Sequence, residues 1–200
     1  MAPYWNELWG NPSNTNNRSG VFASAAVEVS REKIASYLNI NPKRLIFTSG
    51  ATEANNLGLV GHARAKAQLI GKPGHIITVS TEHHAVLDPL RQLQKEGFRL
   101  TELQPNKEGL INIEQLSEAF EKDTFLVSVM AANNEIGVLQ PIGDIGSFCK
   151  RKGISFHSDA AQAFGYLDLD PDKFHIDLMS LSAHKIYGPK GIGALVIREG

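Results

Sequence analysis

The fold of this chain is decided by residues 177–197, which read DLMSLSAHKIYGPKGIGALVI. Two β-rich apolar runs, 177–181 and 193–197, flank a polar segment that contains Gly188 and Gly191. Because this segment is too short for the helical crossover that joins parallel strands, we expect the last strand to run antiparallel to its neighbour.

Upstream of this stretch, β-rich runs alternate with stretches of helical periodicity, which is typical of an α/β fold on a largely parallel sheet. The expected helices are 21–38, 53–69, 85–96, 113–120 and 142–152. The other expected strands are 44–48, 75–79, 99–103, 124–130 and 154–157. Residues 1–20 are rich in Asn, Ser, Gly and Pro, so we expect an N-terminal loop segment before a domain over 21–200.

Composition excludes several classes of protein. A net charge of −1 provides no field to recruit nucleic acid or an anionic membrane, so we expect neither partner. No signal-peptide pattern opens the chain, and no run approaches the roughly 18 apolar residues of a membrane span. One cysteine, Cys149, cannot form an intramolecular disulfide, which fits a reducing compartment. We therefore expect a cytoplasmic protein.

Ligands of open α/β sheets bind beyond the carboxyl ends of the strands, and the residues just after the expected strands are polar. The first such group, residues 49–52, joins a strand to a helix. Its small residues and the free N–H groups of a helix start can hold a phosphate, with Thr52 adding a hydroxyl. The alternative is an ordinary helix start capped by Ser49 or Thr52. The Walker pattern is missing, which disfavours a nucleotide phosphate.

Asp159 and His83 also follow strands. A carboxylate in a crevice needs a partner, and a protonated pyridine nitrogen would be one; the alternative is a cap for the segment that starts at Ala160. The imidazole of His83 could stack on a cofactor ring or carry protons. His83 and His84 also suggest a metal, but no motif with metal-ligand spacing accompanies them, so we expect no metal site.

Lys185 lies in the polar turn after the strand at 177–181. A lysine beside a phosphate and an aromatic ring loses its proton more easily and can form a Schiff base. Lys190 is the rival, but its flanking Pro189 and Gly191 are typical of a turn lysine.

Five runs resemble those of cysteine desulfurases, which belong to the class V aminotransferase-like group of fold-type I pyridoxal-phosphate (PLP) enzymes. The runs are 47–53, 81–83, 133–137, 159–162 and 182–191. The match extends from about Gly10 to the C-terminus. It implies a three-layer α/β/α architecture with a mostly parallel sheet and one antiparallel strand, as in the large domain of PLP-dependent transferases.

The resemblance also implies roles at matching positions. Lys185 would hold the cofactor covalently and move protons, Asp159 would face the pyridine nitrogen, and His83 would stack on the ring and assist proton transfer. Gln162 would hydrogen-bond the ring hydroxyl, and Asn134 would contact the substrate or that hydroxyl. The phosphate would be held by Ala51, Thr52, Ser182 and His184.

The activity that this resemblance implies is conversion of L-cysteine to L-alanine, with the sulfur passing to an enzyme cysteine as a persulfide. That sulfur would feed iron–sulfur clusters and thio-cofactors. A homodimer is expected, with a sulfur-acceptor or scaffold protein as a possible partner. Alternatives are another class V enzyme (a selenocysteine lyase, a kynureninase or an aminotransferase) and a noncatalytic remnant or binding module.

Departures from the family pattern lead us to expect a chain truncated at both ends. Family members have a strand before the Gly10 region, and residues 14–17 lack the family's histidine. The small domain, the acceptor cysteine and an arginine for the substrate carboxylate would follow Gly200. We expect Cys149 to be a buried structural thiol rather than a replacement acceptor.

Overall fold

The computed structural model describes residues 2–199, which divide between Lys43 and Arg44 into two compact units. The first unit contains two helices, α1 (Ala2–Asn6) and α2 (Arg18–Tyr37). The expectation of a loop over residues 1–20 is therefore wrong at 2–6 and 18–20, and residue 1 lies outside the described residues. The division of the chain into 1–20 and 21–200 stays a prediction.

Local hydrogen bonds explain both early helices. The Pro3 carbonyl accepts from the N–H groups of Glu7 and Leu8, at 2.9 and 2.7 Å, and proline is well tolerated in a first helical turn. Asn17 is the N-cap of α2, and its side-chain oxygen accepts from the Gly20 N–H at 2.7 Å. The asparagine-rich composition therefore predicted a loop, although one of these asparagines, Asn17, caps the start of a helix.

The second unit alternates strands and helices almost as expected. Its strands are β1 (Leu45–Thr48), β2 (His75–Val79), β3 (Arg99–Leu103), β4 (Thr124–Ser128), β5 (Ser155–Asp159), β6 (Leu178–Ser182) and β7 (Gly193–Ile197). Its helices are α3 (Ala51–Asn55), α4 (Gly61–Ile70), α5 (His84–Lys95), α6 (Ile113–Ala119) and α7 (Ile142–Lys152). Shorter turns are η1 (Pro42–Arg44), η2 (Asn56–Val60) and η3 (His184–Ile186).

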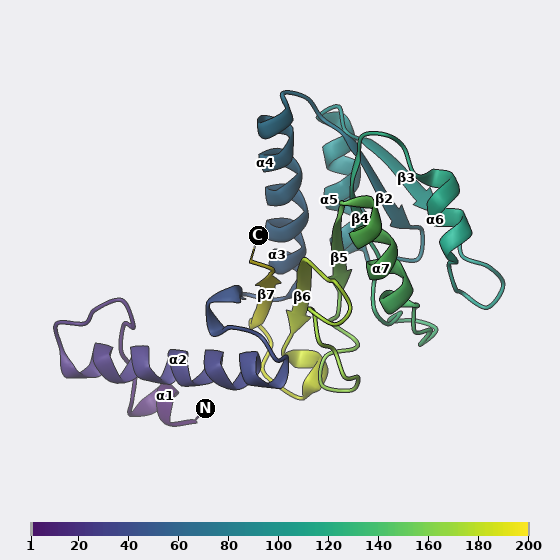
Figure 1. The fold of residues 1–200 in the computed structure, drawn as a ribbon. Helices are drawn as coiled ribbons and strands as arrows, with labels where there is room; N and C mark the ends of the chain where they lie inside the picture. Colours follow the sequence, from purple (N-terminus) through teal and green to yellow (C-terminus); the bar gives the residue numbers. More distant parts are fainter. Residues whose placement is uncertain (1, 200) are drawn as a thin grey trace. The chain divides into compact units, whose positions relative to one another are not determined.

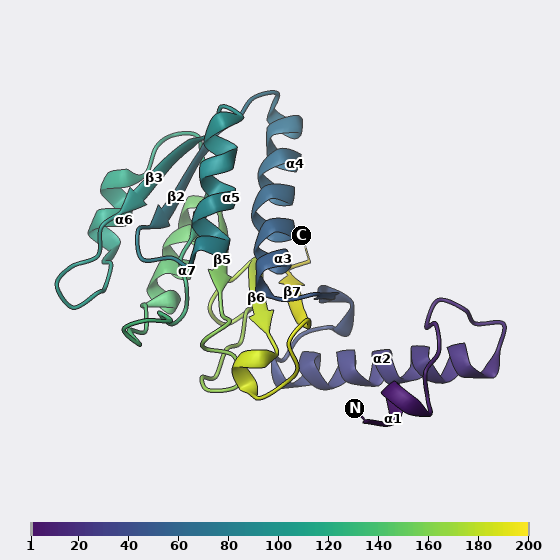
Figure 2. The same ribbon diagram turned by 180° about the vertical axis from the view of Figure 1, so that it is seen from behind.

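Within the described residues the strands form one seven-stranded sheet in the order β1-β7-β6-β5-β4-β2-β3. Neighbours from β6 to β3 are parallel, whereas β7 is antiparallel to both β6 and β1. The arrowheads of β6 and β7 accordingly point in opposite directions in Figures 1 and 2. The predicted mostly parallel sheet with one antiparallel strand is confirmed.

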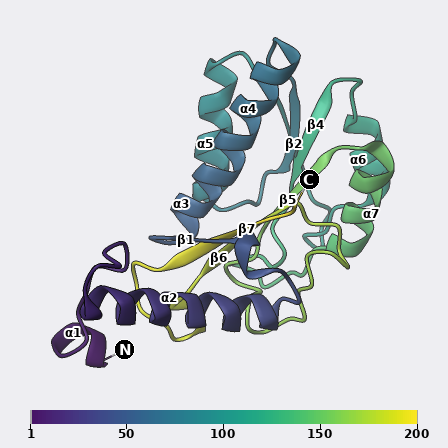
Figure 3. The ribbon, with the colours of Figure 1, turned by 60° about the vertical axis from the view of Figure 1, so that its left-hand side comes forward.

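Helices cover both faces of this sheet. Figure 3 shows α3, α4 and α5 on one face and α6 and α7 on the other, which gives the three expected layers. Two of the covering helices, α5 and α7, turn an apolar stripe inward, as helical spacing dictates. In α5 the stripe includes Val86, Leu90 and Leu93, and in α7 it includes Ile145 and Phe148.

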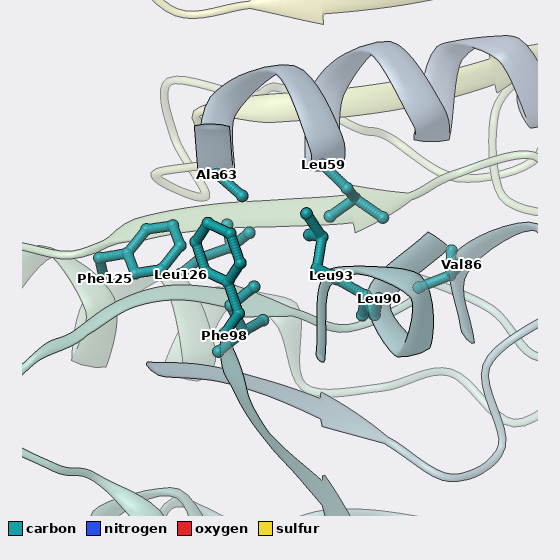
Figure 4. Close-up of a cluster of buried hydrophobic side chains, with 9 residues drawn as sticks. Leu59, Ala63, Val86, Leu90, Leu93, Phe98, Phe125 and Leu126 are labelled. Carbon is teal, nitrogen blue, oxygen red and sulfur yellow. The ribbon is translucent and has the colours of Figure 1, made fainter. Parts of the chain in front are cut away.

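The core between the sheet and the first helical layer is built from long aliphatic and aromatic side chains. Figure 4 shows Leu59 facing Leu93 of α5, and Ala63 over the rings of Phe98 and Phe125. The Phe98 and Phe125 rings lie 6.0 Å apart between centroids. This packing fixes the carboxyl ends of the strands relative to the helices that follow them.

The helix expected over 53–69 is interrupted. Between α3 and α4 the backbone forms η2, a π-helical turn, with Gly58 and Leu59 buried. At Gly58 a Cβ atom would lie 3.2 Å from a Leu195 methyl group, so glycine allows this turn to pack closely on β7. None of the described helices is both long and apolar enough to cross a membrane.

Candidate active site

A cavity of about 400 Å³ opens at the carboxyl ends of the parallel strands. All nine residues proposed from the sequence line it, and they come from five segments that are far apart in the chain. These residues are Ala51, Thr52, His83, Asn134, Asp159, Gln162, Ser182, His184 and Lys185. Their convergence follows from the fold, because parallel strands place all their carboxyl ends at one edge of the sheet.

One side of the cavity is formed by the start of α3. Gly50 is the N-cap residue and no side chain caps the helix, so the alternative of a cap by Ser49 or Thr52 is wrong. The first-turn N–H groups therefore lack the usual side-chain acceptor. A Cβ at Gly193 would lie 2.5 Å from the Gly50 carbonyl carbon, so only glycine lets these backbones approach.

Ser182 and His184 face the same part of the cavity from the end of β6. Ser182 is almost fully buried, and its hydroxyl lies 3.0 Å from His184 Nδ1. The hydrogen bond orients both groups beside the first turn of α3. Backbone N–H groups, the hydroxyls of Thr52 and Ser182 and the His184 imidazole thus line the same cavity, and together they are a donor set suited to a phosphate.

Asp159 is the last residue of β5 and is 6% exposed. Its Oδ1 accepts from the Ala161 N–H at 2.9 Å, and its Oδ2 accepts from Asn55 Nδ2 at 2.7 Å. Burial raises the pKa of Asp159, and these two hydrogen bonds and His83 act in the opposite direction. One oxygen thus caps the following segment, as the alternative supposed, while the carboxylate also lines the cavity.

His83 is the N-cap residue of α5. Its Nδ1 accepts from the Ala85 N–H at 3.0 Å, which places the proton of the neutral imidazole on Nε2. His84 is exposed, and its Nδ1 lies 3.6 Å from Asp88 Oδ1. Among residues 2–199 no group of three His, Cys, Asp or Glu side chains is placed to hold a metal ion.

Both rival lysines line the cavity. Lys185 lies in η3, where the Ala183 carbonyl accepts from the Ile186 and Gly188 N–H groups at 3.1 and 2.9 Å. The Tyr166 hydroxyl donates to the Lys185 carbonyl at 3.0 Å. The backbone of Lys185 is therefore fixed from both sides. That Lys190 also reaches the cavity was not expected from its sequence context.

Comparison with known proteins identifies the family. The model of the aminotransferase class-V family matches residues 1–200. The chain belongs to this family. Its members depend on PLP, so the class V resemblance and the cofactor expected from the five runs are confirmed.

Two curated relatives of this class V chain bear names of cysteine desulfurases. The chain is 50% identical over 199 residues to "Cysteine desulfurase IscS" of Dechloromonas aromatica. It is 51% identical over 199 residues to "Probable cysteine desulfurase, mitochondrial" of Schizosaccharomyces pombe. All of the chain is matched, but only 49% and 39% of these relatives is covered. The chain thus spans about half the length, or less, of the curated relatives it matches.

Solved structures agree with this fold. The chain matches "SspA in complex with cysteine" with a TM-score of 0.93 and 43% identity, over 98% of this chain and 56% of that one. It matches a "NIFS-LIKE PROTEIN" with a TM-score of 0.92 and 37% identity, over 100% and 54% of the two chains.

The cavity of this class V chain fits PLP. Asp159 is a buried carboxylate that forms no ion pair with any residue in the described range 2–199, so a cationic ring nitrogen would complete its interactions. The uncapped start of α3 and the Gly50–Gly193 approach provide the space and the donors for a phosphate. Lys185, His83 and Gln162 line the same cavity.

Cys149 is buried on α7, as expected of a structural thiol. It is 1% exposed, and burial raises its pKa to about 12. A thiol with that pKa is a poor nucleophile near neutrality, because the thiolate is the reactive form. Cys149 is therefore unsuited to accept sulfur.

Sequence reasoning missed the side chains that support the site from behind. Asn55 is fully buried and donates to Asp159, yet it was not among the candidate residues. Its position three residues after Thr52 on one helix was a usable signal, because residues at i and i+3 share a helix face. Met130 and Ala132 line the cavity as well, but apolar residues after an apolar strand give no such signal.

Proposed function

We propose that the protein is a PLP-dependent cysteine desulfurase, which converts L-cysteine to L-alanine and passes the sulfur to an acceptor thiol. The observation that carries this proposal is the convergence of Asp159, His83 and Lys185 from separate strand ends on one cavity. Membership of the class V family and the names of the curated relatives support the reaction. A neighbour described in complex with cysteine supports the substrate.

The ring end of the site is held by Asp159, Gln162 and Asn134. When bound, PLP supplies an electron sink for charge that develops at the substrate Cα. Asp159 would accept a hydrogen bond from a protonated ring nitrogen, and its burial would strengthen this interaction. Gln162 hydrogen-bonds the ring hydroxyl, and Asn134 contacts that hydroxyl or the substrate.

The phosphate end is held by the segments after β1 and β6. The N–H groups of Ala51 and Thr52, the Thr52 hydroxyl, Ser182 and His184 bind the phosphate oxygens. Support comes from the missing side-chain cap of α3 and from the hydrogen bond that orients Ser182 toward His184.

Lys185 and His83 are the proposed catalytic residues. The Lys185 amine holds the cofactor and then moves a proton at the substrate Cα. The His83 ring would stack on the cofactor, and its Nε2, which carries the proton because Nδ1 accepts from the Ala85 N–H, would assist proton transfer.

The sulfur acceptor in this proposal is a thiol other than Cys149, because Cys149 is buried and its pKa is raised. The acceptor thiolate attacks the sulfur bound to the substrate Cβ, the C–S bond breaks, and its electron pair ultimately takes up a proton as L-alanine forms. The acceptor then carries a persulfide, which can supply iron–sulfur cluster and thio-cofactor synthesis. The reaction of L-cysteine with the acceptor thiol to give L-alanine and the acceptor persulfide is balanced without an external oxidant or reductant.

Further aspects of the proposal concern the assembly and the compartment. We place the PLP-binding large domain over residues 21–200 and expect a homodimer with a sulfur-acceptor or scaffold protein as partner. Trp5 and Trp9 are each 73% exposed, which supports an interface in the first unit. A cytoplasmic location rests on cysteine usage, and because one relative is described as mitochondrial, cell fractionation is the test.

The proposal is tested by PLP titration and by product analysis on the full chain. Wild type and Lys190→Ala should develop a visible absorption band with PLP, whereas Lys185→Ala should not. With a small-molecule thiol added as the sulfur acceptor, because Cys149 is the one cysteine of the sequence, Lys185→Ala should form alanine from L-cysteine about 10³-fold or more slowly than wild type.

The reverse behaviour of the two lysine variants would assign the role to Lys190. Turnover of selenocysteine or kynurenine, or transfer of an amino group, in place of sulfur release from cysteine would assign the chain to another class V activity.

A further inference from the structure

Glu82 occupies an unusual place for a carboxylate. It lies between β2 and α5, directly before His83, and is only 6% exposed. Its Oε1 accepts from the Met130 N–H at 2.5 Å. Met130 lines the cavity, and the N–H of the next residue, Ala131, donates to the Asp159 carbonyl at 2.9 Å. Glu82 thereby ties the loop that carries His83 to the backbone beside Asp159.

The other oxygen of Glu82 has no partner. Glu82 Oε2 and Asn55 Oδ1 are both buried without a hydrogen-bond partner. Asn55 donates to Asp159, and Met130 and Ala131 connect Glu82 to Asp159, so both unpartnered atoms belong to one buried polar cluster around Asp159, and both are acceptors. If Glu82 carries a proton on Oε2, this oxygen becomes a hydrogen-bond donor. A buried cluster with two unpartnered acceptors needs such a donor.

Asp159 and Glu82 differ in how well a negative charge on each is supported. Both Asp159 oxygens accept hydrogen bonds from N–H groups, whereas Glu82 receives only one. Burial raises the pKa of Glu82 well above its ordinary value, the charge of Asp159 adds to this, and the Met130 N–H opposes it. His83 is the other titratable group that acts on this pair, through Asp159. Two adjacent buried carboxylates do not both ionise readily, so the charge belongs on Asp159.

We propose that Glu82 is a positioning residue of the site and stays protonated, so that the buried pair of Glu82 and Asp159 carries one negative charge, on Asp159. The effect of Glu82 on PLP rests on the proposed function. A neutral Glu82 still accepts from Met130, which holds the His83 loop and the segment after β4 together. A charged Glu82 would place a second carboxylate near the ring nitrogen and change its proton affinity.

The proton is tested on the full chain without PLP by infrared spectroscopy at neutral pH. Glu82→Gln should lose a carbonyl absorption of a protonated carboxylic acid that wild type shows. The control Glu118→Gln, which alters an exposed glutamate of α6, should keep it. An identical carboxylic acid region in wild type and Glu82→Gln would overturn the proposal.

The positioning role is tested with PLP. Glu82→Gln keeps the shape and neutrality, so the pH midpoint of the visible band of bound PLP should match wild type. Glu82→Leu cannot accept from Met130 and should weaken PLP binding about tenfold. A midpoint in Glu82→Gln moved by about one pH unit or more would show that Glu82 is charged, and unchanged affinity in Glu82→Leu would refute positioning.

These two measurements separate the inference from the proposed function. If wild type failed to bind PLP, the proposed function would fall, while the infrared comparison would still decide the state of Glu82. If Glu82→Leu failed to fold, Glu82→Gln alone would still decide it, because a shifted midpoint contradicts a neutral Glu82.

Discussion

One edge of the sheet is formed by the amino ends of its parallel strands and the opposite edge by their carboxyl ends. Each of these two edges buries a polar cluster, and the clusters differ in whether all their polar atoms have hydrogen-bond partners. At the amino ends of the strands, the His75 ring nitrogens lie 2.8 Å from Thr124 Oγ1 and 2.9 Å from Thr101 Oγ1. At the carboxyl ends, the cluster of Asp159, Asn55 and Glu82 leaves two buried oxygens unpartnered. The cluster around His75 is thus satisfied by side chains of the chain itself, whereas the cluster beside the cavity holds two acceptors that lack a donor.

The largest effect should come from Asp159→Ala. Losing the carboxylate leaves the ring nitrogen of PLP without its buried partner, which costs about 3–5 kcal/mol, or roughly 10²- to 10⁴-fold in affinity. Without PLP the free energy of unfolding should fall by only about 1–2 kcal/mol, the value of two hydrogen bonds. Absorbance titration and urea unfolding measure these two quantities.

The control for this change is Asp144→Ala, which removes an exposed carboxylate from the first turn of α7. Its affinity for PLP should equal that of wild type. If Asp159→Ala bound PLP as tightly as this control, the polar cluster at the carboxyl edge would stabilise only the fold, as the cluster at the amino edge does. The difference between the two edges would then be refuted.

His75→Ala should show the opposite pattern. It opens a cavity and leaves the hydroxyls of Thr124 and Thr101 without a partner, so the free energy of unfolding should fall by about 2–4 kcal/mol. Affinity for PLP should not change, because the ring lies at the far edge of the sheet. The exposed His84→Ala should alter stability by no more than about 0.5 kcal/mol. Weaker PLP binding in His75→Ala would mean that the two edges are coupled.

The smallest effect is a pH dependence from the middle of the sheet. The ring nitrogens of His157 lie 2.8 Å from Ser128 Oγ and 3.2 Å from Ser180 Oγ. Burial, with a further contribution from His62, lowers the pKa of His157 to about 3. The unfolded chain takes up this proton below about pH 6.5 while the folded chain does not, so stability is full above that pH and is lost as pH falls toward 3.

At pH 5 this loss from His157 should reach about 2 kcal/mol relative to pH 7. Urea unfolding as a function of pH measures it, and His157→Gln should flatten the slope in that range. An equal slope in both proteins would show that other groups cause the acid sensitivity.

Most of the sheet could be predicted from the sequence, because its strands are apolar runs between turn residues. Even the antiparallel β7 followed from the short segment before Gly193. The failures have local causes: α1 depends on hydrogen bonds to the Pro3 carbonyl, and α2 begins where Asn17 caps it. Neither feature changes the composition that indicated a loop.

The candidate site was predictable where chemistry and strand ends coincide, as for Asp159, His83 and Lys185. The supporting residues could not be predicted, because their roles depend on how deeply their side chains are buried. Asn55 and Glu82 resemble helix and loop polar residues in the sequence, and only their burial gives them a part in the site. Lys190 resembles a turn lysine, and only the folded chain brings it to the cavity.

The π-helical turn η2 has a consequence for how this protein can change. A π turn takes up one residue more than an α turn, so the face of α3 that carries Thr52 and Asn55 is out of phase with the face on which Leu59 and Ala63 pack. Deleting one residue between 56 and 58 would restore a continuous α-helix and rotate Thr52 and Asn55 by about 100° about its axis. The core would stay packed while the site lost its alignment, so the length of this turn constrains the chemistry more tightly than it constrains the fold.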